Sequence, residues 1–502
     1  MYRGKSWLRI GRLAGALGIA VLVAAAVASA RPGSGQSYSG GSRPSGGGYG
    51  GGGGGGDGGF AINLLIWLLI ENPVIGIPIV LIVIAVVIVK SVASSRMKGW
   101  STTPTEVAAV QQFEQSSLVP RVELDRIRTI DPGFSVVLFE DFVYMLYAAI
   151  QRARATGTAS IAAYLSEQVA SSMRDASLSE VSGIIIGAMR TLRFSGTGGA
   201  TVEVEIEIEA NFVEKPRTGS ERRYYVVDRL LLQRATSARS RPVERARTLD
   251  CPSCGAPLEA IRGTECSYCK QNVGFGRFDW MVQEFSNRTC EPRGPLLTSD
   301  VREEGTDLPT IVDPGANSRF REVEVRDPAL TWGAIEARVA HVFGELQVAW
   351  SGRDPKQIRP YVSDNLFQSM VYWIDLYLQQ HCRNMNENAR ILRIDLANIL
   401  SDAHYDAVTV RLFATGLDYT VSDDGRLLSG NRSRPRTYSE YWTLIRNSGS
   451  KGSTQGNANC PNCGAPLKVG MTGNCESCNA RVTSGEFDWV LSRIEQDEAY
   501  SG

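Results

Sequence analysis

The chain has 502 residues, which is enough for about three domains, and its 53 Lys and Arg residues balance its 53 Asp and Glu residues. A formal net charge of zero creates no long-range field that attracts polyanions, so the composition does not favour a dedicated nucleic-acid binder. Hydrophobic residues make up 43% of the chain, a globular proportion, but they are distributed unevenly.

Residues 1–30 have the three parts of a secretory signal peptide. Basic residues precede the apolar run 13–27, and the small residues Ala28, Ser29 and Ala30 follow it. This order predicts cleavage after Ala30, with an uncleaved first membrane helix as the alternative. Residues 31–59 are rich in Gly and Ser and cannot bury apolar surface, so we expect a disordered linker there.

Hydrophobic sequence returns at residue 60. Residues 60–70 are apolar but too short to span a bilayer, and a polar ENP sequence separates them from a second apolar run. At 1.5 Å per residue, residues 74–93 can cross a hydrocarbon core of about 30 Å. We therefore expect an interfacial or re-entrant lead-in at 60–70 and a transmembrane helix at 74–93. Basic residues lie in the last turn of this helix and just after it, and by the positive-inside rule they place the later chain in the cytoplasm. They are Lys90, Arg96 and Lys98.

The rest of the chain contains a duplicated unit. Asp131-Pro132 opens the first copy and Asp327-Pro328 the second, and the pattern I-x-x-Y-x-S occurs at 161–166 and again at 358–363. In each copy apolar residues recur first at helical spacing, at 139–150 and 335–350. A second helix is predicted at 363–380. Apolar residues later alternate with polar ones, as at 202–208, and strands are predicted at 389–401, 406–419 and 438–446. Helices followed by an antiparallel sheet predict an α+β domain at 120–248 and another at 326–448.

Each copy ends in a four-cysteine module. CPSCGAPL at 251–258 recurs as CPNCGAPL at 460–467, and a second C-x-x-C pair follows each after an equal interval. The two sets are Cys251, Cys254, Cys266 and Cys269, and Cys460, Cys463, Cys475 and Cys478. Two such knuckles place four thiolates at the corners of a tetrahedron, which suits a structural Zn²⁺ and leaves no open position for catalysis. We predict two structural zinc ions; paired disulfides are the alternative, which a reducing cytoplasm disfavours.

An FDW sequence follows each of these zinc ribbons, and we expect a helix after each, within 249–286 and 458–496, with a linker at 287–325. The ribbons lack basic or aromatic clusters between their cysteine pairs, so they are predicted to be structural caps that do not bind nucleic acid. The two remaining cysteines, Cys290 and Cys382, have no C-x-x-C partner and are expected to be free thiols.

The second copy resembles the Tim44-like domain family, and the first copy does so more loosely. The resemblance lies in DPALTWGAIEARVAHVFGELQVAWSGRDPKQIRPYVSDNL, DAVTVRLFATGLDYTVSDDGRLLSGN and YSEYWTLIR, and the second ribbon is similar to one found in some bacterial members. The family includes the scaffold of the mitochondrial import motor and many bacterial membrane-anchored relatives. The resemblance implies two tandem cone-shaped barrels like nuclear transport factor two. It also implies a non-enzymatic scaffold at the bacterial inner membrane, with cytoplasmic C-terminal domains that bind protein partners or lipid.

The resemblance also implies an apolar pocket inside the cone. Five large side chains of the second copy are candidates to line it, with ordinary core packing as the alternative: Phe343, Leu346, Trp373, Tyr377 and Trp442.

An enzyme that uses this pocket is an alternative function. Asp375 lies within an aromatic segment and is a candidate acid or base acting on a small apolar substrate. However, His341, His381 and His404 have no ligand or triad spacing, and the sequence contains no Walker loop, G-x-S-x-G or HExxH motif. We therefore predict no catalytic residues and no small-molecule substrate.

An anionic-lipid sensor is a further alternative. Arginines between the first predicted sheet and its ribbon could each contribute roughly 1 kcal/mol of attraction to lipid headgroups, with a solvated linker as the competing interpretation. These residues are Arg234, Arg239, Arg241, Arg245 and Arg247.

Overall fold

The computed structural model describes residues 124–292, 305–452, 459–497, 499–500 and 502. All of them belong to one compact unit that includes Pro120–Gly502. The predicted signal peptide, the glycine-rich linker, the lead-in and the transmembrane helix at 74–93 lie outside the described residues. Within the described part of the chain, no helix is both long and apolar enough to cross a membrane.

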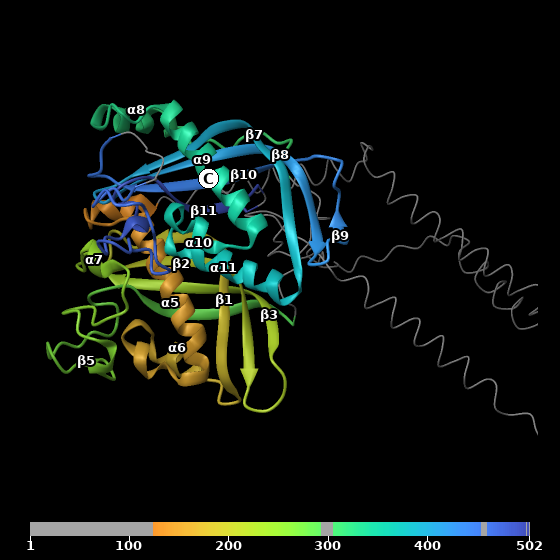
Figure 1. Ribbon diagram of the computed structural model, residues 1–502. Helices are drawn as coiled ribbons and strands as arrows, with labels where there is room; N and C mark the ends of the chain where they lie inside the picture. The colour runs from red at the N-terminus through yellow and green to blue at the C-terminus, as the bar shows by residue number, and fades with distance from the viewer. Residues whose placement is uncertain (1–123, 293–304, 453–458, 498, 501) are drawn as a thin grey trace, which may run out of the picture. The chain divides into compact units, whose positions relative to one another are not determined.

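The first repeat, residues 124–292, begins with helices and continues as a sheet (Figure 1). Its helical elements are η1 (Leu124–Thr129), α5 (Val136–Thr156), η2 (Thr158–Tyr164) and α6 (Glu167–Ser172), where η marks a 3-10 helix. Strands β1 (Leu178–Ser195), β2 (Thr201–Pro216) and β3 (Arg222–Ala235) come next. The short elements α7 (Val243–Ala246), η3 (Leu258–Ala260), β4 (Ile261–Arg262) and β5 (Glu265–Cys266) lead to β6 (Met281–Glu291). The long strands form an antiparallel sheet in the order β1-β2-β3-β6.

The second repeat, residues 305–502, has the same order of long elements. Its helical elements are α8 (Ala316–Arg326), α9 (Trp332–Gly352), α10 (Pro355–Ile358), η4 (Arg359–Tyr361) and α11 (Asp364–Gln379). The strands are β7 (Cys382–Ser401), β8 (Tyr405–Ser422), β9 (Leu427–Gly430) and β10 (Arg436–Asn447). After the second ribbon, which contains η5 (Val482–Ser484), comes β11 (Val490–Gln496). The sheet order is β11-β10-β8-β7, with β9 paired to β8.

Both long helices begin where the sequence gives them a hydroxyl cap. Ser135 accepts a hydrogen bond from the first turn of α5 at 3.4 Å, and Thr331 does the same for α9 at 3.2 Å. Each cap satisfies a backbone N–H that has no partner within the helix. The predicted apolar faces at 139–150 and 335–350 pack into two separate hydrophobic cores, so the helical periodicity is confirmed.

The alternating pattern of β2 is also confirmed. Val202, Val204, Ile206 and Ile208 are each at most 1% exposed, because side chains of a strand point alternately to its two faces and one face of this sheet covers the core. The second helix predicted at 363–380 is α11, and the three strands predicted in the second repeat are β7, β8 and β10. The α+β class is therefore confirmed.

The segments after the ribbons are strands, so the two helices predicted there are wrong. β6 pairs with β3, and β11 pairs with β10, in each case as an outer strand of the sheet. Pairing gives the backbone groups of both partners a hydrogen-bonded ladder, and this tertiary contact overrides weak local periodicity. The linker predicted at 287–325 is shorter as a result, because β6 extends to Glu291 and α8 begins at Ala316.

Candidate functional site

The two sets of four cysteines each form a cluster that can hold a metal ion. Within each set the four sulfur atoms lie within 4.8 Å of one another, and all eight cysteines are free thiols. The Sγ–Sγ distances are 3.9 Å for Cys251–Cys269 and 3.8 Å for Cys254–Cys266. A tetrahedral site with metal–sulfur bonds of about 2.3 Å has an edge of about 3.8 Å, whereas a disulfide requires about 2.05 Å. The geometry therefore fits a four-thiolate metal site and does not fit disulfides.

The local sequence of each knuckle explains how the cluster forms. Gly255 and Gly464 follow the first pair of cysteines at φ of 81° and 73°, a left-handed conformation that glycine adopts without a steric penalty. The backbone N–H of Gly255 donates to the carbonyl oxygen of Cys251 at 2.9 Å, and that of Gly464 donates to the carbonyl oxygen of Cys460 at 2.8 Å. The second cluster has an additional donor, since Asn462 Nδ2 lies 3.4 Å from Cys478 Sγ.

Each ribbon is fixed to its sheet by the tryptophan of its FDW sequence. In the first repeat the Arg234 guanidinium lies over the Trp280 ring at 4.8 Å and pairs with Asp131 at 2.9 Å. All of these groups are buried, so the cation is held by a carboxylate and a π face together.

The second repeat repeats this cluster. Arg446 lies over Trp489 at 4.8 Å and pairs with Asp327 at 2.8 Å. Sequence reasoning noticed the repeated DP and FDW sequences but missed their role, which is to lock ribbon to sheet.

The five residues predicted to line a cone pocket are core residues. Their exposed fractions lie between 0% and 4%, and they belong to the hydrophobic core of the second repeat: Phe343, Leu346, Trp373, Tyr377 and Trp442. Phe343 packs against Trp442 with ring centroids 6.0 Å apart. Trp373 also lines a cavity of about 110 Å³. Packing against other side chains accounts for these aromatic residues without a ligand.

The arginines proposed for lipid headgroups are mostly engaged within the protein. Arg241 is 9% exposed and pairs with Asp250 at 2.9 Å and with Asp279 at 2.8 Å. Arg245 pairs with Asp250 at 3.3 Å, and Arg239 is exposed and donates to backbone carbonyls of its own turn. The segment is a folded connection and not an open linker, and its placement does not favour headgroup binding.

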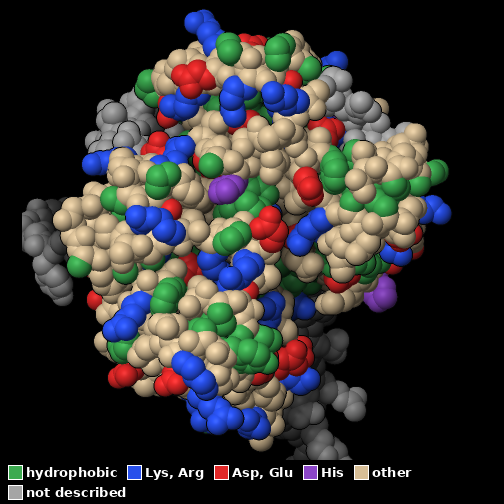
Figure 2. Space-filling model, turned by 90° about the vertical axis from the view of Figure 1, so that its left-hand side faces the viewer, with side chains coloured by type: hydrophobic (Ala, Val, Ile, Leu, Met, Phe, Trp, Pro, Cys, Tyr) green, Lys and Arg blue, Asp and Glu red, His purple; other side chains and the backbone are tan. Residues whose placement is uncertain are grey.

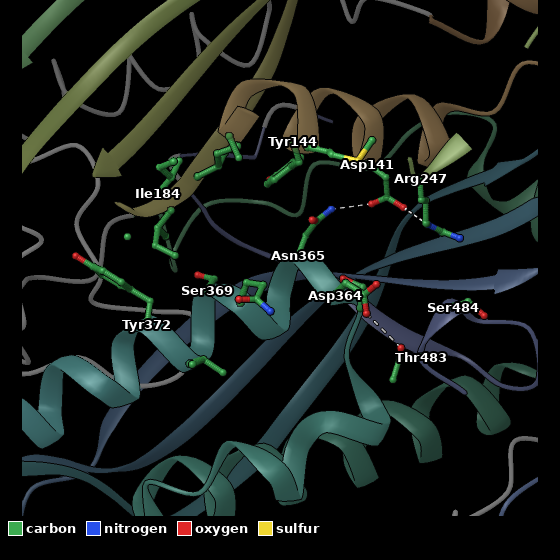
Figure 3. Close-up of a pocket in the computed structure, with 18 of the residues that line it drawn as sticks. Asp141, Tyr144, Ile184, Arg247, Asp364, Asn365, Ser369, Tyr372, Thr483 and Ser484 are labelled. Atoms are coloured by element: carbon green, nitrogen blue, oxygen red, sulfur yellow. Dashed lines mark hydrogen bonds and ion pairs between the residues drawn. The ribbon is translucent and has the colours of Figure 1, made fainter. Parts of the chain in front are cut away.

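Arg247 instead joins the two repeats. Its Nε donates to Asp141 of α5 at 2.7 Å, and its Nη1 donates to the Tyr405 hydroxyl of β8 at 2.9 Å. Asp141 also accepts from Asn365 of α11 at 2.8 Å. Figure 3 shows Asp141, Arg247 and Asn365 beside a cavity of about 540 Å³ that is lined by both repeats.

The candidate acid Asp375 lies in this cavity and not inside a cone. It is an exposed residue of α11. Two of the buried acidic side chains, Asp228 and Glu440, are 2% and 1% exposed and occupy corresponding positions of β3 and β10. Sequence reasoning missed both, although the repeated strand sequences DRLLLQR and EYWTLIR place an acid at the same position.

Asp228 is held by three donors. Tyr147 and Gln151 donate to one oxygen at 2.7 and 3.1 Å, and Asn287 donates to the other at 2.8 Å. Burial raises the pKa of Asp228, and these hydrogen bonds oppose the rise. The carboxylate is thus part of a satisfied buried network.

None of the three histidines forms a triad with described residues. His341 packs edge-on against Tyr361 at 5.1 Å, His381 lies 3.7 Å from Asp423 at an exposed turn, and the backbone N–H of His404 donates to Asp402.

Comparison with known proteins identifies the second repeat. Residues 316–456 match the family described as Tim44-like domain. This range covers α8 to β10, so the second repeat matches a Tim44-like domain and its resemblance is confirmed, whereas the matched range does not include the first repeat. No curated protein matches the chain. Among solved structures, an "Ntf2 like protein involved in plasmid conjugation" is 9% identical and matches over 66% of this chain and 83% of its own, with a TM-score of 0.16. A TM-score this low supports no further conclusion.

Proposed function

We propose that the protein is a non-enzymatic scaffold or adaptor that is anchored in the bacterial inner membrane by residues 74–93 and holds two cone-shaped α+β barrels in the cytoplasm. The Tim44-like domain at 316–456 is the observation that carries this proposal. The packing of the second repeat agrees with it, because aromatic side chains fill the interior where an enzyme of this fold would need a pocket.

Each four-cysteine cluster is proposed to hold one structural Zn²⁺. The sulfur spacing fits tetrahedral zinc, and four thiolates match the usual ligands of structural zinc sites. Zinc binding supplies about 10–16 kcal/mol in small zinc-finger peptides, which is enough to order a ribbon with little core of its own. The bound ion would hold the ribbon fold and place the FDW tryptophan against its buried arginine.

The charge distribution and the exposed aromatic side chains of the surface support a scaffold that binds its partners mainly through apolar contacts. On the face drawn in Figure 2, basic and acidic side chains are interspersed with apolar ones. The first ribbon exposes Tyr268 by 74% and Phe275 by 58%, while Ser477 and Ser484 stand at the corresponding positions of the second ribbon. Exposed aromatic residues of this kind are frequent contacts for protein partners or for a lipid interface.

Crosslinking in intact cells tests the scaffold function. The full chain is compared with a tether-only control that ends at residue 123, and crosslinked proteins and lipids are identified after detergent extraction. We expect specific proteins or lipids that require the folded repeats. Recovery of the same set with the tether alone would contradict a scaffold, and turnover of a co-purified metabolite would favour the enzyme alternative.

A further inference from the structure

The first repeat has an apolar sheet edge that is not paired with another strand among the described residues. β1 pairs only with β2 in the described part of the chain, and its residues 183–189 read GIIIGAM, without charge or proline. Natural proteins usually protect such edges with charged residues, proline, bulges or a covering segment, because unpaired backbone groups recruit other strands. The pairing register of β1 with β2 shifts twice here, between Ser182 and Ile185 and between Ile186 and Ala188.

This edge lines two adjoining cavities. The larger, of about 540 Å³, is bounded by Gly183 and residues 184–186, and the smaller, of about 110 Å³, by residues 186–188 and Arg190. The two share four lining residues: Tyr144, Ile186, Asn365 and Ser369. Side chains of a strand alternate between its faces except where a bulge adds a residue. The unbroken run of lining residues 183–188 therefore includes both faces of β1 and places its backbone edge at this space. Figure 3 shows Ile184 of β1 and Ser369 and Tyr372 of α11 around the larger cavity.

A second sheet edge borders the smaller cavity. β11 is the outer strand of the second sheet, and its consecutive residues 492–496 line this space. Arg190 of β1 interacts electrostatically with Glu495 of β11, which brings the two edges to one groove. We call this space, from Gly183 to Arg190, the edge groove; at about 3.3 Å per residue it is about 23 Å long.

The corresponding edge of the second repeat is covered. The backbone N–H of Asp313 donates to the carbonyl of Ala397 in β7 at 2.8 Å, and the Arg319 side chain donates to the carbonyl of Ile399. Among the described residues, nothing outside the sheet donates to or accepts from the backbone of residues 183–190 of β1. The leading segment of the second repeat therefore covers the edge of β7, whereas the edge of β1 in the first repeat lies next to a cavity.

The electrostatics of the edge groove indicate an occupant of low net charge. The lining contains four ion pairs, which are Asp141 with Arg247, Asp364 with Arg481, Glu209 with Arg190, and Glu495 with Arg493. The lining charges of the two cavities that remain, Arg152 and Asp375, are one of each sign. Apolar side chains of β1, α5 and α11 lie between these pairs: Ile184, Ile186, Met145 and Val371.

We propose that the edge groove binds an extended segment of a partner protein, about seven residues long, of low net charge and with apolar side chains at alternate positions, which adds as a strand to β1. Main-chain hydrogen bonds to β1 supply affinity, and alternate side chains contact the apolar lining. This inference rests on the proposed scaffold function and deepens it, since it names the class of partner and the site.

The test uses full-length protein in detergent and a fluorescein-labelled, end-capped nonapeptide, Gly-Ser-Val-Thr-Val-Thr-Val-Ser-Gly. A twin peptide carries N-methyl groups on alternate residues, so it keeps the side chains but cannot form one row of strand hydrogen bonds. We expect the plain peptide to bind about tenfold more tightly than the twin and to slow amide hydrogen exchange at residues 183–190. Equal binding of the two peptides would overturn strand addition.

Two variants test whether the peptide binds in the edge groove. Ser369→Trp fills the groove at a residue shared by both cavities, and Gln368→Trp narrows it from an exposed position if the first variant folds poorly. Ser318→Trp on α8, exposed and outside both cavities, is the matched control. We expect about tenfold weaker peptide binding for the first two variants and wild-type binding for the control. Unchanged binding in both groove variants would refute the site.

Further outcomes separate this proposal from the scaffold function. If cellular crosslinks persist in Ser369→Trp while the peptide fails to bind wild type, the scaffold stands and the edge groove is rejected. If the peptide binds as expected but the repeats recover no partner in cells, the groove stands and the scaffold is rejected. A change of oligomeric state in Ser369→Trp would assign the groove to a second copy, and binding only after deletion of residues 100–119 would assign it to this chain itself; either result overturns a partner segment.

Discussion

Removing the carboxylate of Asp327 should destabilise the second repeat far more than loss of a surface ion pair. The side chains of Asp327 and Arg446 are 6% and 2% exposed, and their charged groups lie 2.8 Å apart. In Asp327→Ala the Arg446 guanidinium still lies over the Trp489 ring, 4.8 Å from its centroid. It loses its counter-ion, however, in a buried site. Breaking a buried pair in this way costs about 3–5 kcal/mol, against about 0–1 kcal/mol for an exposed pair.

Urea unfolding of the full chain, followed by tryptophan fluorescence, measures the effect. With an m-value of about 2 kcal/mol/M, the expected loss shifts the midpoint of the second repeat by about 1.5–2.5 M. The double variant Asp327→Leu with Arg446→Met removes both charges and should recover most of this loss, because no unpaired charge remains buried. A single variant within about 0.3 M of wild type, or a double variant as unstable as the single one, would refute the reasoning.

The first repeat supplies an internal comparison. Asp131 pairs with Arg234 at 2.9 Å and also accepts from the backbone N–H and the hydroxyl of Ser240, at 2.9 and 2.7 Å. Asp131→Ala should therefore cost at least as much as Asp327→Ala. A markedly smaller cost would mean that the two clusters are not energetically equivalent.

Three further predictions concern the metal, a glycine and a buried acid. Elemental analysis should find two zinc ions per wild-type chain and one in Cys475→Ser; full occupancy in the variant would contradict the assigned ligands. Gly485 has φ of 77°, and an added Cβ would lie 3.0 Å from the Ile445 carbonyl oxygen, so Gly485→Ala should cost about 1–3 kcal/mol in calorimetry. Gly425→Ala, at φ of 86° with open space around it, should cost less. Because the pKa of Asp228 is raised on folding, its protonated form contributes stability at low pH that is lost as pH rises through the folded pKa; Asp228→Asn should flatten this part of a melting-temperature profile.

The parts of the molecule that the sequence predicts are those encoded over short distances. The four cysteines of each ribbon lie within one short segment, and their spacing alone brings the thiols together. The helix faces and the alternation of β2 are likewise local patterns. By contrast, β6 and β11 depend on partners β3 and β10 across the ribbon, and their short apolar patterns fit a helix or a strand.

The arginine segment shows why sequence could not predict the rest. Arg234 meets Asp131, and Arg247 meets Asp141 and Tyr405, so the partners lie far away in the chain. Without the tertiary fold these arginines look like a free basic cluster. The cavity beside β1 has the same origin, because its walls come from both repeats.

Duplication explains how such a cavity can arise without weakening either core. Each repeat has its own hydrophobic core and its own ribbon lock. A smaller buried cluster, which includes Leu138 of the first repeat and Tyr405 and Val490 of the second, joins the two repeats, and none of these three residues lines the cavity. The second repeat covers the edge of β7 through its leading residues, Asp313 and Arg319, and also supplies α11 as a wall beside β1. A single repeat would expose the apolar edge of β1 to solvent and to aggregation. With α11 of the second repeat beside it, the same edge is partly shielded from solvent but still borders a cavity. Selective binding of an extended chain requires this arrangement.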